Sequence, residues 1–343
     1  MKKNWKRWIA LTLTAATAAA LTACGSTDTA DTANTQEGTA EKTIVKVGVV
    51  GEYNAQWDTI NELLAPDNIE VELVKYTDYA IPNQALNDGD IDLNAFQHKA
   101  YLANDIQQKG YDITAIGDTL IAPLGIYNNK DKISSIDEIK DGDVIAIPSD
   151  LTNGGRALKL LEKAGIIECD PAKGFVPTKA DITKYNKQID IIEAESATLA
   201  NLLPDCTAAI INGGNAYTAG LDPTADTIFV EDVNPETNEA VPDLINVIVA
   251  RTADKDNEVY QKVVAAYQPP KVQKTIEETY KGAFICAWEG ADATSNTNTD
   301  EVTTDEAATT DETTATDAVD ATVAPTELSN TDEASTDETT SAE

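Results

Sequence analysis

This sequence of 343 residues contains a single histidine, His98. The four cysteines lie far apart, and no pair among them and His98 has a separation typical of zinc sites. At most one disulfide could join Cys169, Cys206 and Cys286, and the favoured interpretation is three buried small apolar side chains. A Gly-x-Ser-x-Gly motif and a nucleophile beside an evident base are also missing. We therefore predict a protein that is not an enzyme and that holds no metal and no cofactor.

Positive charge is scarce as well. The chain has 25 Lys and Arg residues against 59 Asp and Glu residues, and its formal net charge is −34. An acidic protein repels both nucleic acid and anionic lipid head groups. We therefore predict that nucleic acid is not a partner.

Long hydrophobic runs are missing. No segment after the N-terminal region offers about 18 consecutive apolar residues, so no transmembrane helix is predicted. The N-terminal region has four basic residues among its first seven positions, and the apolar stretch over 8–21 that follows is too short to span a bilayer comfortably. This pattern is typical of an export signal, which we place at residues 1–23.

The end of this signal, Leu21-Thr-Ala-Cys24 followed by Gly25, resembles a bacterial lipobox. At such a motif the chain is cut before the cysteine, whose sulfur is acylated with fatty acids such as palmitate. Each buried methylene contributes about 0.8 kcal/mol, so the acyl chains hold a soluble domain at a membrane. We predict lipidation of Cys24 and localisation at the cell membrane, facing the extracytoplasmic side. The alternative is an ordinary cleaved signal with an incidental cysteine.

Two segments contain little that a folded core could bury. Residues 24–43 are rich in Thr, Ala, Asp and Glu, which predicts a flexible tether. Residues 289–343 have 16 acidic and no basic residues, with five Thr-Asp-Glu units, which predicts a disordered acidic tail. A solvating role is the favoured interpretation of this tail, and binding of divalent cations or of a partner remains an alternative.

The intervening residues alternate between β-rich and helical patterns. Strands are predicted over 45–50, 69–76, 91–95, 144–148, 189–193, 207–211, 227–230 and 245–250. Helices are predicted over 57–65, 82–87, 101–109, 136–140, 155–164, 257–267 and 272–280. This alternation indicates an α/β fold with a largely parallel sheet or sheets. In such sheets ligands bind beyond the carboxyl ends of the strands.

Aromatic and polar residues follow the second and third predicted strands. Tyr79 lies just before a helix whose first turn contains Pro82, and Phe96 and His98 follow the strand over 91–95. All three are therefore candidates for a ligand site. The alternatives are that Tyr79 and Phe96 are core residues and that His98 makes a structural hydrogen bond.

The segment after the strand over 144–148 reads Ser149-Asp-Leu-Thr-Asn-Gly-Gly-Arg156. We expect Thr152 or Asn153 to cap the next helix, and we expect the glycines to let a ligand approach free backbone N–H groups. Arg156, placed in the first turn, adds a bidentate donor, so the segment predicts a carboxylate-binding site. The alternative is that Arg156 pairs with a surface acid, but an arginine there opposes the helix dipole and calls for a local anion.

Several motifs occur in order between residues 44 and 288. The longest are Asp78-Tyr-Ala-Ile-Pro-Asn-Gln-Ala-Leu86 and Gly89-Asp-Ile-Asp-Leu-Asn-Ala-Phe-Gln-His-Lys99. Shorter ones are Pro123-Leu-Gly-Ile-Tyr127, Ile147-Pro148, Ala209-Ile-Ile-Asn-Gly213, Phe229-Val-Glu-Asp232 and Ile245-Asn-Val-Ile-Val249. Together they resemble the methionine-binding lipoproteins of ABC importers, the NlpA and MetQ family. Several separated motifs in order are far more specific than any one of them.

The resemblance implies a type II periplasmic-binding-protein-like fold, with two α/β lobes and a ligand cleft between them. Lobe one would comprise residues 44–123 and 230–288, and lobe two residues 124–229. The implied function is that of a membrane-anchored, extracytoplasmic solute-binding lipoprotein. It would capture L-methionine and deliver it to an ABC permease with its ATPase.

The resemblance also implies seven ligand-binding residues, with Arg156 on the amino-acid carboxylate. Those at the polar end of the ligand are Asn153, Arg156, Asn212 and Asn246. Those around the thioether chain are Tyr79, Phe96 and His98. An aromatic edge beside a sulfur atom contributes about 0.3–1.5 kcal/mol, which suits such a pocket.

Two segments, 51–57 and 213–217, are less typical of this family, and both could contact the ligand. They leave the ligand open among D- or L-methionine, a methionine-containing dipeptide and another small apolar amino acid. An adhesive surface lipoprotein without a transport role is the alternative from a different class.

Overall fold

The computed structural model describes residues 42–291. The predicted signal peptide, the lipidation site Cys24, nearly all of the predicted tether and most of the predicted acidic tail lie outside this range. Within it, no helix is both long enough and apolar enough to cross a membrane.

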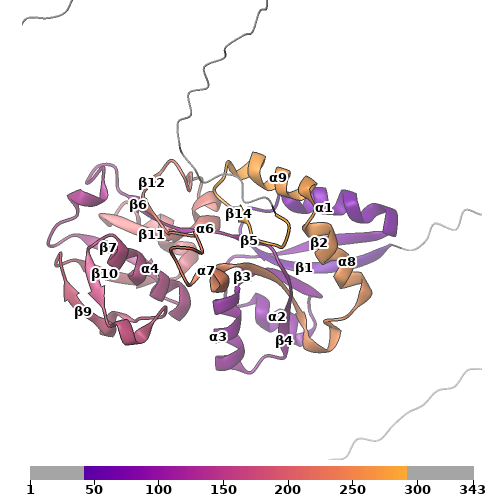
Figure 1. The fold of residues 1–343 in the computed structure, drawn as a ribbon. Coiled ribbons are helices and arrows are strands. Elements are labelled where there is room, and N and C mark those ends of the chain that lie inside the picture. Colours follow the sequence, from indigo (N-terminus) through magenta and orange to yellow (C-terminus); the bar gives the residue numbers. More distant parts are fainter. Residues whose placement is uncertain (1–41, 292–343) are drawn as a thin grey trace, which may run out of the picture. The chain divides into compact units, whose positions relative to one another are not determined.

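Ten strands form two five-stranded sheets, which belong to one compact unit (Figure 1). The first sheet has the order β2-β1-β3-β13-β4 and the second has the order β10-β7-β11-β6-β12. The first contains β1 (Thr43–Val50), β2 (Ile69–Tyr76), β3 (Leu93–His98), β4 (Ile113–Asp118) and β13 (Asn246–Arg251). The second contains β6 (Leu124–Asn128), β7 (Val144–Pro148), β10 (Asp190–Ala194), β11 (Ala208–Asn212) and β12 (Thr227–Val230). We call each sheet with its helices a lobe.

The sheets are mixed, and the prediction of largely parallel sheets is wrong in this respect. Strand β1 pairs in parallel with β2 and β3, but β13 runs antiparallel to β3 and β4. In the second sheet β7 pairs in parallel with β10 and β11, and β6 runs antiparallel to β11 and β12. Strand direction is invisible in the sequence pattern, because a central strand buried on both faces is apolar throughout in either direction.

The chain passes between the sheets twice. It leaves the first sheet after Asp118 and enters the second at Leu124, and it returns between Val230 and Asn246. Short elements accompany these crossings. They are β5 (Leu120–Ile121), which pairs with β14 (Ile285–Cys286), and α7 (Val241–Leu244).

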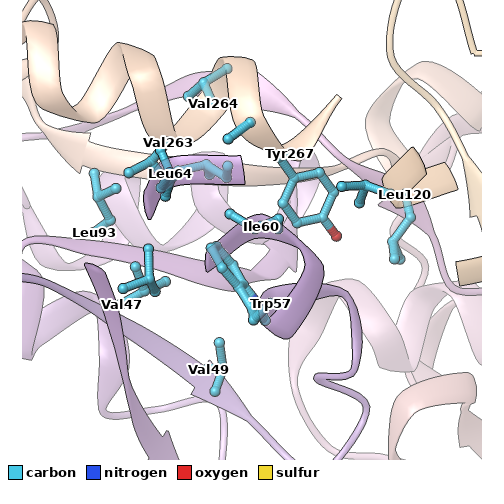
Figure 2. Close-up of a cluster of buried hydrophobic side chains, with 14 of the residues drawn as sticks. Val47, Val49, Trp57, Ile60, Leu64, Leu93, Leu120, Val263, Val264 and Tyr267 are labelled. Carbon is cyan, nitrogen blue, oxygen red and sulfur yellow. The ribbon is translucent and has the colours of Figure 1, made fainter. Parts of the chain in front are cut away.

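Helices cover both faces of the first sheet. On one face lie α1 (Gln56–Leu64), α8 (Glu258–Tyr267) and α9 (Pro270–Tyr280), and on the other lie α2 (Pro82–Asp88) and α3 (Lys99–Lys109). Because side chains alternate along a strand, Ile248 packs on the first face and Val247 and Val249 pack on the second. Figure 2 shows the larger core, where Trp57 and Ile60 of α1 pack among strand valines and the α8 side chains.

The second sheet is covered in the same way. Helix α4 (Leu151–Lys163) packs against Ile145 and Ile147 on one face. The short helices α5 (Leu199–Leu202) and α6 (Gly213–Thr218) contribute to the other face, around Ala146. A two-stranded sheet of β8 (Ile167–Cys169) and β9 (Ile182–Tyr185) follows α4.

Several predicted boundaries shift. Strand β3 extends through His98, so Phe96 and His98 lie within the strand, and His98 caps α3, which starts two residues before the predicted helix. The predicted helix over 136–140 is only a 3-10 turn, Ile136–Glu138. The cysteines at 169, 206 and 286 are free, and the first two are buried among apolar side chains.

Candidate functional site

A small cavity lies between the two lobes and is lined by residues of both. The structure brings all seven predicted ligand-binding residues to its walls. They are Tyr79, Phe96 and His98 with Asn246 from the first lobe, and Asn153, Arg156 and Asn212 from the second. They meet because β3, β7 and β11 end, and β13 begins, at the edges of the sheets that face each other across the cavity. Their roles in binding remain predictions.

Five further residues line the cavity. They are Tyr53, Gln97, Tyr101, Ala122 and Gly214. Tyr53 and Gly214 come from the two segments that are less typical of the family. The unusual sequence of these segments therefore points to both residues. No pattern in the sequence indicated Gln97 or Ala122.

Helix α4 begins earlier than the sequence predicted. Its N-cap is Asp150, whose carboxylate accepts a hydrogen bond from the backbone N–H of Asn153 at 2.9 Å. The expected cap at Thr152 or Asn153 is therefore wrong, and Arg156 lies in the second turn. The segment contains several good capping residues in a row, and the local sequence does not decide which of them is used.

The two glycines of α4 also have a different role from the predicted one. A Cβ atom at Gly154 would lie 2.8 Å from the carbonyl oxygen of Pro148, and one at Gly155 would lie 2.8 Å from the Cα atom of Val176. The glycines therefore let the helix pack closely on neighbouring backbone. They do not open backbone N–H groups to a ligand.

Arg156 is bound by a buried acid, Glu231. The Nε atom donates to Oε1 of Glu231 at 3.0 Å and Nη2 donates to Oε2 at 2.5 Å, and the two side chains are 2% and 8% exposed. The same carboxylate accepts the backbone N–H of Leu124 at 3.0 Å. Arg156 thus does pair with an acid, but the acid is buried and not on the surface. The Nε/Nη2 fork is occupied, so a ligand carboxylate would meet the Nη1 side.

The Nη1 side of Arg156 points to Asn153, whose Oδ1 is the meeting point of three donors. It accepts from Nη1 of Arg156 at 3.2 Å, from Nδ2 of Asn212 at 2.8 Å and from Nε2 of His98 at 3.3 Å. The Asn153 amide nitrogen donates to the carboxylate of Asp150 and so fixes this orientation. A carbonyl oxygen has two lone pairs, so three convergent donors leave capacity for a further acceptor such as a carboxylate oxygen.

The tautomer of His98 follows from its contacts. The backbone N–H of Tyr101 donates to Nδ1 at 3.1 Å, so Nδ1 carries no proton and Nε2 is the donor toward Asn153. Burial, and secondarily the charge of Arg156, lowers the pKa of His98 to about 3. The imidazole is therefore neutral and acts as a fixed donor.

This shift predicts a pH-dependent stability. The folded state resists protonation of His98 down to about pH 3, whereas the unfolded chain binds a proton below about pH 6.5, so stability falls as the pH drops below 6.5. Between pH 7 and pH 5 we expect a loss of about 2 kcal/mol. Because the chain has one histidine, His98→Gln should remove most of this loss in urea unfolding curves. An equal loss in the variant would contradict the assignment.

Three aromatic side chains form another part of the cavity wall. Phe96, 5% exposed, and Tyr101, 7% exposed, lie with Tyr79 at ring-centroid distances of 5.9–6.0 Å. The Tyr101 hydroxyl donates to the backbone carbonyl of Tyr79 at 3.0 Å, which fixes the loop before α2. Burial raises the pKa of Tyr79 well above its ordinary value, so its hydroxyl stays protonated. Phe96 and Tyr79 are thus both packed side chains and parts of the cavity wall.

Asn212 leaves one acceptor free. Its Nδ2 donates to Asn153, but within residues 42–291 its buried Oδ1 has no hydrogen-bond partner. A buried acceptor without a donor costs about 1–3 kcal/mol, so this atom is suited to receive an N–H group from a ligand.

Across the same described range, no group of three or more His, Cys, Asp or Glu side chains is arranged to hold a metal ion.

Comparison with known proteins covers nearly all of the described region. The sequence model of the NlpA lipoprotein family matches residues 45–288. Outer membrane lipoprotein 3 of Mannheimia haemolytica is 42% identical over 251 residues, which are 73% of this chain and 91% of that protein. The D-methionine-binding lipoprotein MetQ of Salmonella typhimurium is 39% identical over 248 residues, or 71% of this chain and 88% of the relative.

Solved structures agree with this relationship. The substrate-binding protein of a methionine transporter from Streptococcus pneumoniae has a TM-score of 0.67 and 34% identity, over 73% of this chain and 97% of that one. The fold is thus α/β, with the two lobes and intervening cleft of type II periplasmic binding proteins. The chain belongs to the NlpA lipoprotein family.

Proposed function

We propose that this protein is a membrane-anchored, extracytoplasmic solute-binding lipoprotein that captures methionine and delivers it to an ABC permease and its ATPase. The observation that carries the proposal is the cavity itself, whose walls combine convergent N–H donors with three aromatic rings. The relatives that bind methionine support the same ligand.

The polar end fits the zwitterionic part of an amino acid. Arg156 and Glu231 neutralise each other, so the attraction for a carboxylate comes from the Nη1 donors and from the amide and imidazole N–H groups around Asn153. The free Oδ1 atom of Asn212 is an acceptor that suits the ammonium group, and Asn246 also lines the cavity. The two ends of the zwitterion thus meet groups of opposite polarity.

The aromatic end fits the thioether side chain. Tyr79, Phe96 and Tyr101 pack together and give the cavity an apolar wall, and a polarizable sulfur gains about 0.3–1.5 kcal/mol from each favourable ring contact. The neutral His98 adds no charge to this space. An apolar, uncharged side chain is therefore favoured over an acidic or basic one.

We infer that the two lobes close on the ligand as bodies, with residues 44–123 and 230–288 moving against residues 124–229. The crossings after Asp118 and after Val230 are where such a hinge would lie. Because residues of both lobes line the cavity, a ligand makes its full set of contacts only when the lobes are together. The closed form would present the shape that the permease recognises.

The test is titration calorimetry of the purified protein with methionine, leucine, glutamate and lysine. We expect binding of methionine with an affinity at least about 100-fold above that for the two charged amino acids. Failure to bind methionine or any other apolar amino acid would contradict the receptor role and favour an adhesive one.

A further inference from the structure

The two segments that are less typical of the family meet each other beside the cavity. The first, 51–57, contains the loop 51–55 between β1 and α1 in the first lobe, and the second, 213–217, lies within α6 in the second lobe. The backbone N–H of Glu52 donates to Oγ1 of Thr218 at 3.1 Å, and Thr218 donates to the carbonyl of Gly214 at 2.8 Å. The loop is therefore fastened to the first turn and the end of α6.

Tyr53 is the residue that this contact positions. A Cβ atom at Gly214 would lie 2.4 Å from Cε1 and 2.8 Å from Cζ of Tyr53, so the ring packs directly on the glycine backbone. On its other side the ring packs on Phe284, with centroids 5.4 Å apart. Tyr53 is only 8% exposed and lines the cavity. Its ring thus packs on Gly214 and on Phe284 and also lines the cavity.

The position of this ring relative to the ligand follows from Asn212. The free acceptor Oδ1 of Asn212 marks the place of the ligand ammonium group, and Gly214, two residues later, carries the Tyr53 ring. Tyr53, Asn212 and Gly214 line the same cavity, and we therefore place the ring at the amino end of the ligand. A further residue joined to that amino group would extend the ligand by about 3.8 Å, into the space of the ring.

We propose that Tyr53, seated on Gly214, is a specificity-determining residue that closes the amino end of the cavity and excludes N-terminally extended ligands such as dipeptides. The inference rests on the proposed function and narrows it from methionine-containing ligands to the free amino acid. The exclusion acts through overlap with a packed ring, which cannot move aside without disturbing the neighbours that hold it. Tyr53 acts by its shape, so its hydroxyl is dispensable for the exclusion.

The experiment measures the affinities of the protein and its variants for methionine and for glycyl-methionine by titration calorimetry. The unchanged protein should prefer methionine by about 100-fold or more, and Tyr53→Ala should reduce that ratio to about tenfold or less by binding the dipeptide more tightly. Tyr53→Phe keeps the ring and should keep the ratio. Tyr217→Ala is the matched control, because Tyr217 packs on Phe284 at 6.5 Å in the same aromatic group but does not line the cavity.

The outcomes separate the two proposals. Binding of neither compound by any form of the protein would overturn the receptor function itself. If methionine binds but Tyr53→Ala leaves the ratio of the two affinities unchanged, only the role of Tyr53 is overturned. The same holds if Tyr217→Ala lowers this ratio as much as Tyr53→Ala does. The ratio of the two affinities can be measured in the unchanged protein even if no variant folds. Equal affinities of that protein for methionine and the dipeptide would also overturn the role of Tyr53.

Discussion

Replacing Arg156 by alanine should abolish the stabilisation of this protein by methionine in a thermal-shift experiment. The Nη1 donors and their partner Asn153 form the polar end of the cavity, and truncating a buried, hydrogen-bonded charge typically costs about 2–5 kcal/mol of binding. That cost corresponds to an affinity loss of about 30-fold to several thousandfold. Methionine concentrations that saturate the unchanged protein should therefore give no shift.

The same substitution also destabilises the folded state, so a second variant is needed to separate loss of methionine binding from loss of stability. Arg156→Ala leaves the carboxylate of Glu231 buried without its partner, which typically costs about 3–5 kcal/mol of stability. The double variant Arg156→Met with Glu231→Gln removes both charges and keeps the volume nearly constant, so it should unfold at a higher temperature than Arg156→Ala. It should still fail to bind methionine.

A matched control is available in Arg251. It lies outside the cavity, pairs with Asp254 at 2.7 Å and donates to the backbone carbonyl of Ile91 at 2.7 Å. Arg251→Ala removes another arginine that pairs with an acid, and methionine should still raise the unfolding temperature of this variant. Retention of a full methionine shift by the folded double variant would show that Arg156 does not bind the ligand.

Replacing Cys24 by serine should release the protein from the membrane into the soluble fraction. Serine lacks the sulfur that the lipobox resemblance predicts to be acylated, and each lost methylene removes about 0.8 kcal/mol of membrane binding. Within residues 42–291 no helix offers a second means of insertion. The measurement is the partition of the expressed protein between membrane and soluble fractions, together with metabolic labelling by palmitate.

The control for this experiment is Cys286→Ser, which changes a free cysteine of the folded region and should leave the partition unaltered. Continued tight membrane association of Cys24→Ser, resistant to high salt, would refute the lipid anchor. Methionine binding should be the same in both variants, because Cys286 does not line the cavity and Cys24 lies outside the described residues that form it.

The sequence predicted the core elements where local patterns suffice. The strand Val144–Pro148 and the helix opening at Pro82 appear as expected, because β-branched runs and a proline in a first helical turn act over a few residues. The start of α4 was missed, since Asp150 competes with two other capping residues. Gly154 was misinterpreted because the atom that requires it, the Pro148 carbonyl, approaches only after folding.

The amino-acid sequence by itself determined the class of this protein. The N-terminal signal, the α/β alternation and the ordered motifs are properties of contiguous residues, and they led to the family and to the seven candidate site residues. Tertiary structure alone decided how those residues are arranged. Arg156 and Glu231 are 75 positions apart, and nothing local to either predicts that one occupies the guanidinium fork of the other. The contact of Tyr53 with Gly214 is likewise a contact between lobes. Such pairings depend on how the two lobes meet, because short-range propensities carry no information about partners so distant in the chain.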